Sequence, residues 1–382
     1  MKISFIGLGK LGLECAEAIV MRSSVAQVHG YDINGFESDY VYVHSSLKGA
    51  IRDSEFIFVA VDTPHHEEYD GSLPTSYLTP KDFDYTNVKN VLKDIATHAK
   101  PGQTVVLIST VLPGTCQEEL IPLLPTTINF VYNPYLIAMG TTTWDMLNPE
   151  MVIIGTENKN IGEKLQSFYK SILMNKNSRF ELCSIGEAEC IKIFYNTFIS
   201  FKLSFVNMIQ DVAELSDDIN CDVVANALGK SSMRLTSDMY MKPGMGDGGP
   251  CHPRDNIALR YLAKKLDLGY DLFDAIMTSR EVQAKRLADK LNSYELPIVI
   301  LGKSFKPGVP YEDGSYSKLV SYFCENVIGY DENVNDKPCT YLLSHRGEYH
   351  DFPFNKYSVI LDIWGEFETK RDDITVIYYG RN

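Results

Sequence analysis

One cysteine stands in a setting suited to covalent chemistry. The stretch GDGGPCHPRD (246–255) places Cys251 after a glycine cluster, with Asp255 four residues later. A thiolate is a strong nucleophile, and glycines let the backbone approach a ligand closely. We therefore predict that Cys251 is a nucleophile. The other cysteines are predicted to be small buried hydrophobic residues: Cys15, Cys116, Cys183, Cys190, Cys221, Cys324 and Cys339.

A second pair of polar groups lies on a long predicted helix. The stretch from Glu187 to about Glu214 contains neither Gly nor Pro, and its length is typical of a helix that links two domains. Lys192 and Asn196 are one turn apart on it and share a face. A lysine in this apolar run either snorkels to solvent or is buried for chemistry, and the pattern alone favours the first.

The elements that must position these groups begin with a dinucleotide-binding pattern. An apolar run leads into GLGKLG, with Gly7, Gly9 and Gly12, and a second apolar run ends at Asp32. In a Rossmann unit the glycines bring backbone N–H groups to a pyrophosphate at a helix N-terminus, and the acid binds the adenosine ribose. No Arg or Lys follows Asp32 closely. The pattern therefore predicts a dinucleotide site and favours NAD over NADP.

Apolar strands continue through the first half of the chain and alternate with helical patterns. This alternation predicts a parallel sheet covered by helices, which binds ligands at the carboxyl ends of its strands. Further strands are predicted at 56–61, 104–110 and 151–156, with helices at 85–98 and 117–123.

Polar residues follow two of these strands. They include Thr63 and Pro64 after one strand and Thr110 at the end of the next. The predicted cofactor contacts are Gly7, Gly9, Lys10, Leu11, Gly12, Asp32, Thr63, Pro64 and Thr110.

A second α/β unit is predicted near the end of the chain. The strand-like run at 297–308 ends in a loop with Lys306 and Gly308 but without GxGxxG, and strands follow at 358–364 and 374–380. We expect it to hold a different nucleotide-like ligand. The predicted fold class is α/β, with two Rossmann-like parallel-sheet domains joined by a long central helix and a helical middle region.

Composition excludes several classes of partner. The chain has 36 basic and 50 acidic residues, for a net charge of −14, and lacks a basic cluster that could follow a phosphate backbone. No apolar run reaches the ~20 residues of a membrane helix, and no signal peptide is recognisable. The scattered cysteines, without a CxxC pair, are typical of reduced thiols. We expect a cytoplasmic protein that binds neither nucleic acid nor membranes, and no metal site.

Several segments together resemble the nucleotide-sugar dehydrogenases, the family of UDP-glucose 6-dehydrogenase and GDP-mannose 6-dehydrogenase. The cysteine segment is the most specific of them, and the similarity covers nearly the whole chain. The matching segments are GLGKLGL at the start, ISTVLPGT (108–115), AECIKIFYNTFISFKLSFVN (188–207), PGMGDGGPCHPRD (243–255), FKPG and LDIWGEF (361–367).

The resemblance implies an NAD-dependent enzyme that oxidises the C6 alcohol of a UDP-hexose to the uronate in two hydride transfers. Cys251 would carry the thiohemiacetal and then the thioester. Lys192 and Asn196 would stabilise the oxyanion. Asp255 would work beside the lysine and a water that Thr110 helps to hold.

The resemblance also implies three domains and a homodimer. They are an NAD-binding domain at 1–183, a central helical dimerisation and catalytic region at 184–290, and a nucleotide-sugar-binding domain at 291–382. The substrate contacts, of which the arginine often comes from a second subunit, would be Leu136, Lys192, Asn196, Arg234, Tyr240, Lys242, Gly246, Gly248 and Lys306.

Three positions depart from the family pattern. Tyr135 and Met139 replace two glutamates, the first of which assists hydrolysis of the thioester, and Asp313 replaces an arginine after FKPG. Two alternatives therefore stay open: a two-electron dehydrogenase of the 3-hydroxyacid type, and a catalytically impaired protein that only binds a sugar nucleotide. The sequence does not determine which base or sugar is bound.

Overall fold

A computed structural model describes most of the chain as two compact units, Met1–Lys202 and Leu203–Asn382. Four predicted site residues, Lys10, Tyr240, Lys242 and Gly248, lie outside the described residues, as do Met139 and the side chain of Cys251. The described ranges are 1–9, 11–22, 27–64, 74, 78–79, 81–137, 140–237, 243–247, 251–309, 311–347 and 349–381.

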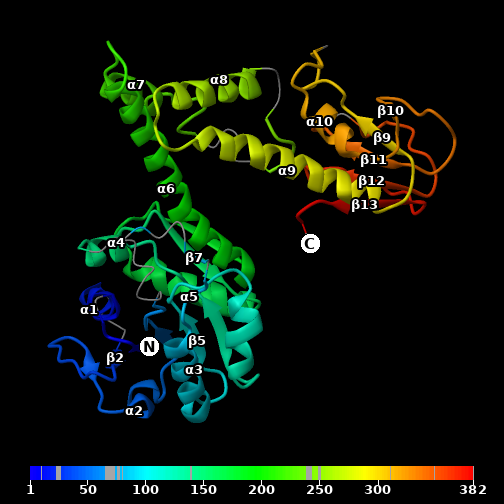
Figure 1. The fold of residues 1–382 in the computed structure, drawn as a ribbon. Coiled ribbons are helices and arrows are strands. Elements are labelled where there is room, and N and C mark those ends of the chain that lie inside the picture. Colours follow the sequence, from blue (N-terminus) through cyan, green and yellow to red (C-terminus); the bar gives the residue numbers. More distant parts are fainter. Residues whose placement is uncertain are drawn as a thin grey trace. The chain divides into compact units, whose positions relative to one another are not determined.

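The first unit is built on an eight-stranded sheet with the order β3-β2-β1-β4-β5-β6-β7-β8 (Figure 1). The first six positions follow the strand order of a dinucleotide-binding fold. The strands are β1 (Lys2–Ile6), β2 (Gln27–Tyr31), β3 (Tyr42–Val43), β4 (Phe56–Val59), β5 (Thr104–Leu107), β6 (Asn129–Tyr132), β7 (Met151–Gly155) and β8 (Arg179–Cys183).

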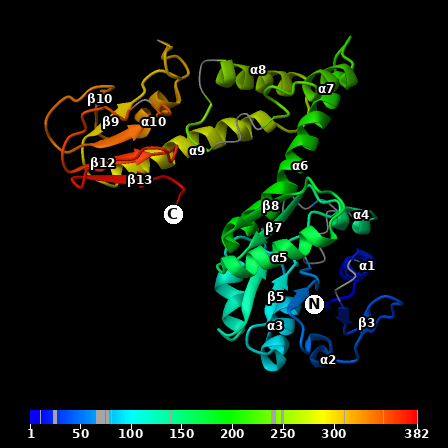
Figure 2. The same cartoon turned by 180° about the vertical axis from the view of Figure 1, so that it is seen from behind.

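Both faces of this sheet are buried, which is why strands such as FIFV and TVVL are continuously apolar. Helices α1 (Gly12–Arg22), α4 (Thr142–Leu147) and α5 (Lys159–Ile172) pack on one face, and α5 lies along β7 and β8 (Figure 2). The other face carries α2 (Leu47–Ile51) and α3 (Thr86–His98).

Several details differ from the sequence-based expectation. Strand β7 pairs with β6 in the antiparallel direction, through Tyr132 and Gly155. Strands β3, β6 and β8 of this sheet were not predicted. The predicted helix at 117–123 is a π-helical turn, Cys116–Leu120, followed by a 3₁₀ turn, Ile121–Leu123. The proline at position 122 lacks the N–H that a regular helix needs there.

The predicted long helix is present as α6 (Ile185–Glu214). Its first part belongs to the first unit and its last part to the second. Within the second unit, α7 (Cys221–Gly229), α8 (Cys251–Lys265) and α9 (Leu272–Asn292) follow it. Helices α8 and α9 pack together, and Arg260 pairs with Asp271 at 2.9 Å, at the start of α9.

The second unit ends in a five-stranded sheet in which all strand pairs are parallel, with the order β10-β9-β11-β12-β13. Helix α9 and α10 (Tyr316–Phe323) cover one face. The other face is covered by aromatic side chains of connecting segments, including Phe354 and Phe367. The strands are β9 (Ile298–Leu301), β10 (Val327–Tyr330), β11 (Thr340–Leu343), β12 (Ser358–Asp362) and β13 (Ile374–Tyr378).

The predicted fold class is thereby confirmed: two Rossmann-like sheets and a helical middle region. Across the described ranges, every helix is too short or too polar to cross a membrane.

Candidate active site

The glycine-rich turn between β1 and α1 is shaped by close contacts. Gly7 has φ +93°, and a Cβ there would lie 2.8 Å from the backbone of Ala60. A Cβ on Gly12 would lie 1.9 Å from the carbonyl oxygen of Gly7. A Cβ on Gly9, by contrast, would have no neighbouring atom within 4 Å. The first and third glycines therefore make the turn possible, and the second leaves room for a phosphate group at the start of α1.

Asp32 follows β2 directly, beside this turn. Its Oδ2 atom accepts a hydrogen bond from the N–H of Leu8 at 2.7 Å, and Oδ1 accepts one from the N–H of Asn34 at 2.8 Å. The carboxylate thus fixes the start of the glycine-rich turn, and its remaining lone pairs can accept ribose hydroxyls. These residues fit the adenosine and pyrophosphate parts of NAD.

The carboxyl ends of β4 and β5 are joined by side chains. The Thr63 hydroxyl donates to the carbonyl of Thr110 at 2.8 Å, and the Ser109 hydroxyl donates to the carbonyl of Val61 at 2.5 Å. The structure thus brings together the predicted contacts Thr63 and Thr110.

Lys192 is buried, with 9% of its surface exposed, contrary to the snorkelling that its sequence pattern alone favoured. Its ammonium donates to the carbonyl oxygen of Tyr135 at 2.6 Å, and burial lowers the pKa of the lysine. Asn196, one turn further along α6, is exposed. A buried ammonium at the carboxyl end of a strand can stabilise negative charge that develops on a substrate oxygen.

Glu189 is a residue that the sequence analysis missed. It is fully buried on the first turns of α6, and its carboxylate accepts the N–H groups of Gly114 at 2.7 Å and Cys116 at 2.8 Å. It ties the loop beyond Thr110 to the helix that carries Lys192. The sequence did contain a signal for it: a carboxylate in a largely apolar stretch of helix, three residues before the lysine, indicates a buried acid that needs hydrogen-bond donors.

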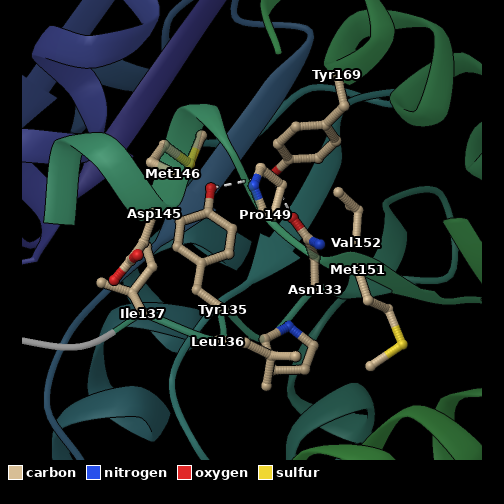
Figure 3. A pocket seen from close by; sticks show the side chains of 11 residues that line it. Asn133, Tyr135, Leu136, Ile137, Asp145, Met146, Pro149, Met151, Val152 and Tyr169 are labelled. Atoms are coloured by element: carbon tan, nitrogen blue, oxygen red, sulfur yellow. Dashed lines mark hydrogen bonds between the residues drawn. The ribbon is translucent and has the colours of Figure 1, made fainter. Parts of the chain in front are cut away.

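Tyr135 points its hydroxyl toward the hydroxyl of Tyr169 (Figure 3). Its hydroxyl lies 2.9 Å from the hydroxyl of Tyr169, which in turn donates to Asn133 Oδ1. Burial raises the pKa of both phenols. The side chain that replaces the family's glutamate is therefore engaged in the interior, and only the backbone carbonyl of Tyr135 reaches the lysine. The predicted substrate contact Leu136 is half-buried beside it.

The predicted nucleophile lies in the second unit. Cys251 is the first residue of α8, and Asp255 is exposed one turn later. Within the described stretch 243–247, Gly246 packs closely on Tyr316, since a Cβ on this glycine would lie 2.2 Å from the tyrosine ring. Arg280 Nε and Asp247 Oδ1 form an ion pair at 2.5 Å in the same place.

The remaining predicted substrate contacts of the second unit are exposed. They are Arg234, after α7, and Lys306, in the turn after β9, with its ammonium 5.7 Å from the ring centre of Phe305. The second sheet also repeats the arrangement at Asp32, because Asp331, after β10, accepts the N–H groups of Gly302 at 2.5 Å and Lys303 at 3.1 Å. That Cys251 and Asp255 of the second unit act together with Lys192 of the first stays a prediction.

The other seven cysteines are free thiols, but only three of them are buried. Burial raises the pKa of Cys183 and Cys324 to about 11, so these thiols are poor nucleophiles at neutral pH. The buried ones are Cys15, Cys116 and Cys339.

Two family models match consecutive parts of the chain. The NAD binding domain of the UDP-glucose/GDP-mannose dehydrogenase family matches residues 34–173, and the central domain of the same family matches residues 186–281. The first model lies in the unit that carries the glycine-rich turn. NAD is therefore the cofactor, as predicted.

Relatives and a solved structure agree with these models. GDP-mannose 6-dehydrogenase of Pseudomonas syringae pv. syringae is 29% identical over 420 residues, covering 100% of this chain and 91% of that protein. UDP-glucose 6-dehydrogenase of Bacillus subtilis is 28% identical over 275 residues, covering 69% and 58%. A ternary complex of GDP-mannose dehydrogenase from Pseudomonas aeruginosa has the same fold, with a TM-score of 0.81 at 22% identity over 98% of this chain and 99% of that one. The chain is a divergent member of the UDP-glucose/GDP-mannose dehydrogenase family.

Proposed function

We propose that the protein is a nucleotide-sugar 6-dehydrogenase that oxidises the C6 primary alcohol of the sugar to a carboxylate. The observation that carries this proposal is the buried ammonium of Lys192, fixed on a carbonyl at the carboxyl edge of an NAD-binding sheet. An alcohol gives up a hydride more readily as it loses its proton, and a fixed cation lowers the energy of that alkoxide.

The reaction would proceed in two oxidations and a hydrolysis. NAD, when bound, accepts one hydride in each oxidation, so two NAD are reduced per sugar. The first oxidation gives an aldehyde, to which the thiolate of Cys251 adds to form a thiohemiacetal. The second converts this adduct to a thioester, and water then releases the carboxylate and regenerates the thiol.

The proposed roles of the other residues come from the resemblance to the family. Lys192 and Asn196 would stabilise the alkoxide and the thiohemiacetal oxygen. Asp255 and Thr110 would hold the water that cleaves the thioester. Tyr135 supplies no base, because its hydroxyl is bound to Tyr169, so hydrolysis is expected to be slow.

The substrate we propose first is a UDP-hexose such as UDP-glucose. GDP-mannose is the second candidate, because relatives that match the whole chain are GDP-mannose 6-dehydrogenases. Arg234, Lys306 and the segment around Gly246 would contact the nucleotide sugar.

We also propose a homodimer. Large apolar side chains are exposed along α6 in the isolated chain, and such a surface is typical of protein contacts. They are Phe194, Phe198, Ile199, Phe201, Leu203 and Val206.

The deciding experiment incubates the purified protein with NAD and a panel of UDP- and GDP-sugars and measures NADH formed per sugar consumed. Two NADH and a uronate support the proposal, and the productive nucleotide identifies the base. One NADH with a released aldehyde or ketone indicates the two-electron dehydrogenase. Binding of a sugar nucleotide without any NADH indicates the impaired binding protein.

A further inference from the structure

Tyr135 has two separate connections, one from its backbone and one from its side chain. Its carbonyl oxygen receives the Lys192 ammonium at 2.6 Å, whereas its hydroxyl lies 2.9 Å from that of Tyr169 on α5. Figure 3 shows the two rings and Asn133 around a small cavity. The position of the carbonyl that holds the lysine is therefore linked to the interior of the first unit.

The hydrogen bonds in this interior run in one direction only. Asn133 Nδ2 donates to the carbonyl of Ile153 at 2.6 Å, so its Oδ1 atom is the acceptor for the hydroxyl of Tyr169. Because Tyr169 uses its proton there, the hydroxyl of Tyr135 must donate to the oxygen of Tyr169. The donor and the acceptor of each hydrogen bond in the series Tyr135–Tyr169–Asn133 are therefore fixed.

Few other polar groups surround these hydroxyls. The cavity beside them has a volume of about 20 Å³, enough for one water. Much of its lining is apolar, including Ile137, Met146 and Val152, and the carboxylate of Asp145 in this lining accepts the hydroxyl of Thr141 at 2.7 Å. If Tyr169 lost its hydroxyl, Tyr135 would lose its acceptor and Asn133 its donor. A buried group without a partner moves toward one if it can, and the turn that carries the Tyr135 carbonyl would move with it.

We propose that Tyr169 is a positioning residue for Lys192: through the hydroxyl of Tyr135 and the amide of Asn133 it fixes the carbonyl on which the ammonium rests. A carboxylate at position 135 could hold the Lys192 ammonium in place by its charge. In this protein the fixed carbonyl of Tyr135 would hold it instead. This inference rests on the proposed role of Lys192 in the dehydrogenase reaction.

The test uses Tyr169→Phe in the full chain, which removes one hydroxyl and keeps the ring. We expect kcat to fall on the order of 10-fold, because small displacements of a catalytic group have large effects on rate, while KM for NAD stays unchanged. A lysine released from its buried place regains solvent and its pKa rises. The alkaline limb of the kcat profile therefore moves to higher pH.

A second readout does not need turnover. Trinitrobenzenesulfonate labels accessible lysines, and mass spectrometry of the digested protein gives the labelling rate of Lys192 alone. We expect this rate, compared at a pH where the amine is neutral in both proteins, to rise several-fold in Tyr169→Phe. Tyr341→Phe is the matched control, because Tyr341 on β11 is also fully buried and its hydroxyl donates to Asn333 Oδ1 at 2.6 Å, in the second unit.

Tyr135→Phe removes the other hydroxyl of the same hydrogen-bond series. It replaces Tyr169→Phe as the test if that variant does not fold. If the hydroxyls act as a unit, the double variant is no slower than Tyr169→Phe alone. The proposal is overturned if Tyr169→Phe, or Tyr135→Phe in its place, loses stability as Tyr341→Phe does but keeps the kcat profile and the Lys192 labelling rate. If the unmodified protein oxidises no nucleotide sugar, the proposed function fails, and the labelling comparison still decides whether Tyr169 positions the lysine.

Discussion

The carboxylate of Glu189 accepts the backbone N–H of Cys116 at 2.8 Å, and the same carboxylate accepts the N–H of Gly114. We predict that Glu189→Gln destabilises the protein by about 1–3 kcal/mol, because the amide nitrogen would face a buried donor. Urea unfolding measures this. Glu187→Gln, which changes an exposed carboxylate at the start of the same helix, should cost less than 1 kcal/mol. Equal losses would contradict the bridging role of Glu189.

Cofactor selectivity follows from Asp32. We expect NAD to bind at least ~10-fold more tightly than NADP, since the carboxylate repels a 2′-phosphate and no basic residue follows it closely. Isothermal titration calorimetry gives both dissociation constants. Asp32→Asn should narrow the difference between the two dissociation constants, whereas Asp39→Asn, at an exposed position after β2, should leave it unchanged. Equal affinities in the unmodified protein would refute the prediction.

Replacement of the predicted nucleophile should separate the two oxidations. Cys251→Ser is expected to lose the second oxidation or the hydrolysis, because a serine alkoxide is much harder to form at neutral pH than a thiolate. NADH per sugar and uronate yield are the measurements, with Cys221→Ser at the start of α7 as the control. Full conversion to the uronate by Cys251→Ser would exclude the thioester route.

Slow hydrolysis should leave a trace on the enzyme. Loss of one general base typically costs about 10²- to 10⁴-fold in rate, so we expect an acyl group on Cys251 to accumulate, detectable by intact-protein mass spectrometry after acid quench. Tyr135→Glu should speed its release, because a carboxylate is costly in the apolar cavity and would turn toward Lys192. Tyr135→Gln, without the charge, should not. Two NADH per sugar with no adduct would mean that hydrolysis is not limiting.

The imidazoles of His29 and His44 are in contact, with Nδ1 and Nε2 2.7 Å apart. Burial, with Lys2 and the neighbouring histidine adding to it, lowers the pKa of His29 to about 4, and the pKa of His44 is also lowered. The unfolded chain takes up these protons near pH 6.5, but the folded protein does so only at lower pH. The pair therefore stabilises the fold above pH 6.5, and this contribution is lost as the pH falls toward 4.

Because both imidazoles are partly exposed, solvent screens part of this effect. We expect the pair to lower the free energy of unfolding by about 1 kcal/mol between pH 7 and pH 5. Urea midpoints at the two pH values measure the change. His29→Gln with His44→Gln should reduce it, and His98→Gln, exposed at the end of α3, should not. An unchanged pH dependence in the double variant would contradict the assignment.

Local patterns predicted the parts of the fold whose cause is local. Strand β4 is a continuous apolar run and β1 is largely apolar, and Gly7 and Gly12 after β1 have steric reasons to be glycine. Strand β8, with the sequence RFELC, mixes charged and apolar residues and gives a weak signal. The antiparallel direction of β7 depends on pairing between distant segments, which no local pattern contains.

The same limit applies to the candidate site. The burial of Lys192 depends on a carbonyl 57 residues away in the chain, so the apolar run around the lysine could not distinguish burial from snorkelling. The orientation of Tyr135 depends on Tyr169, which lies on α5, 34 residues further along the chain. The substitution at Tyr135 was visible in the sequence, but the direction of its side chain was not.

The carboxylates of Asp32 and Asp331 occupy equivalent places, each after the second strand of its sheet and each bonded to the turn after the first strand. Only the first of these turns has the GxGxxG pattern. An acid at this place thus has a structural role, because it connects the ends of two neighbouring strands whether or not it also contacts a ligand. A search for cofactor sites that relied on the acid alone would find two in this chain, and the glycines are what tell them apart.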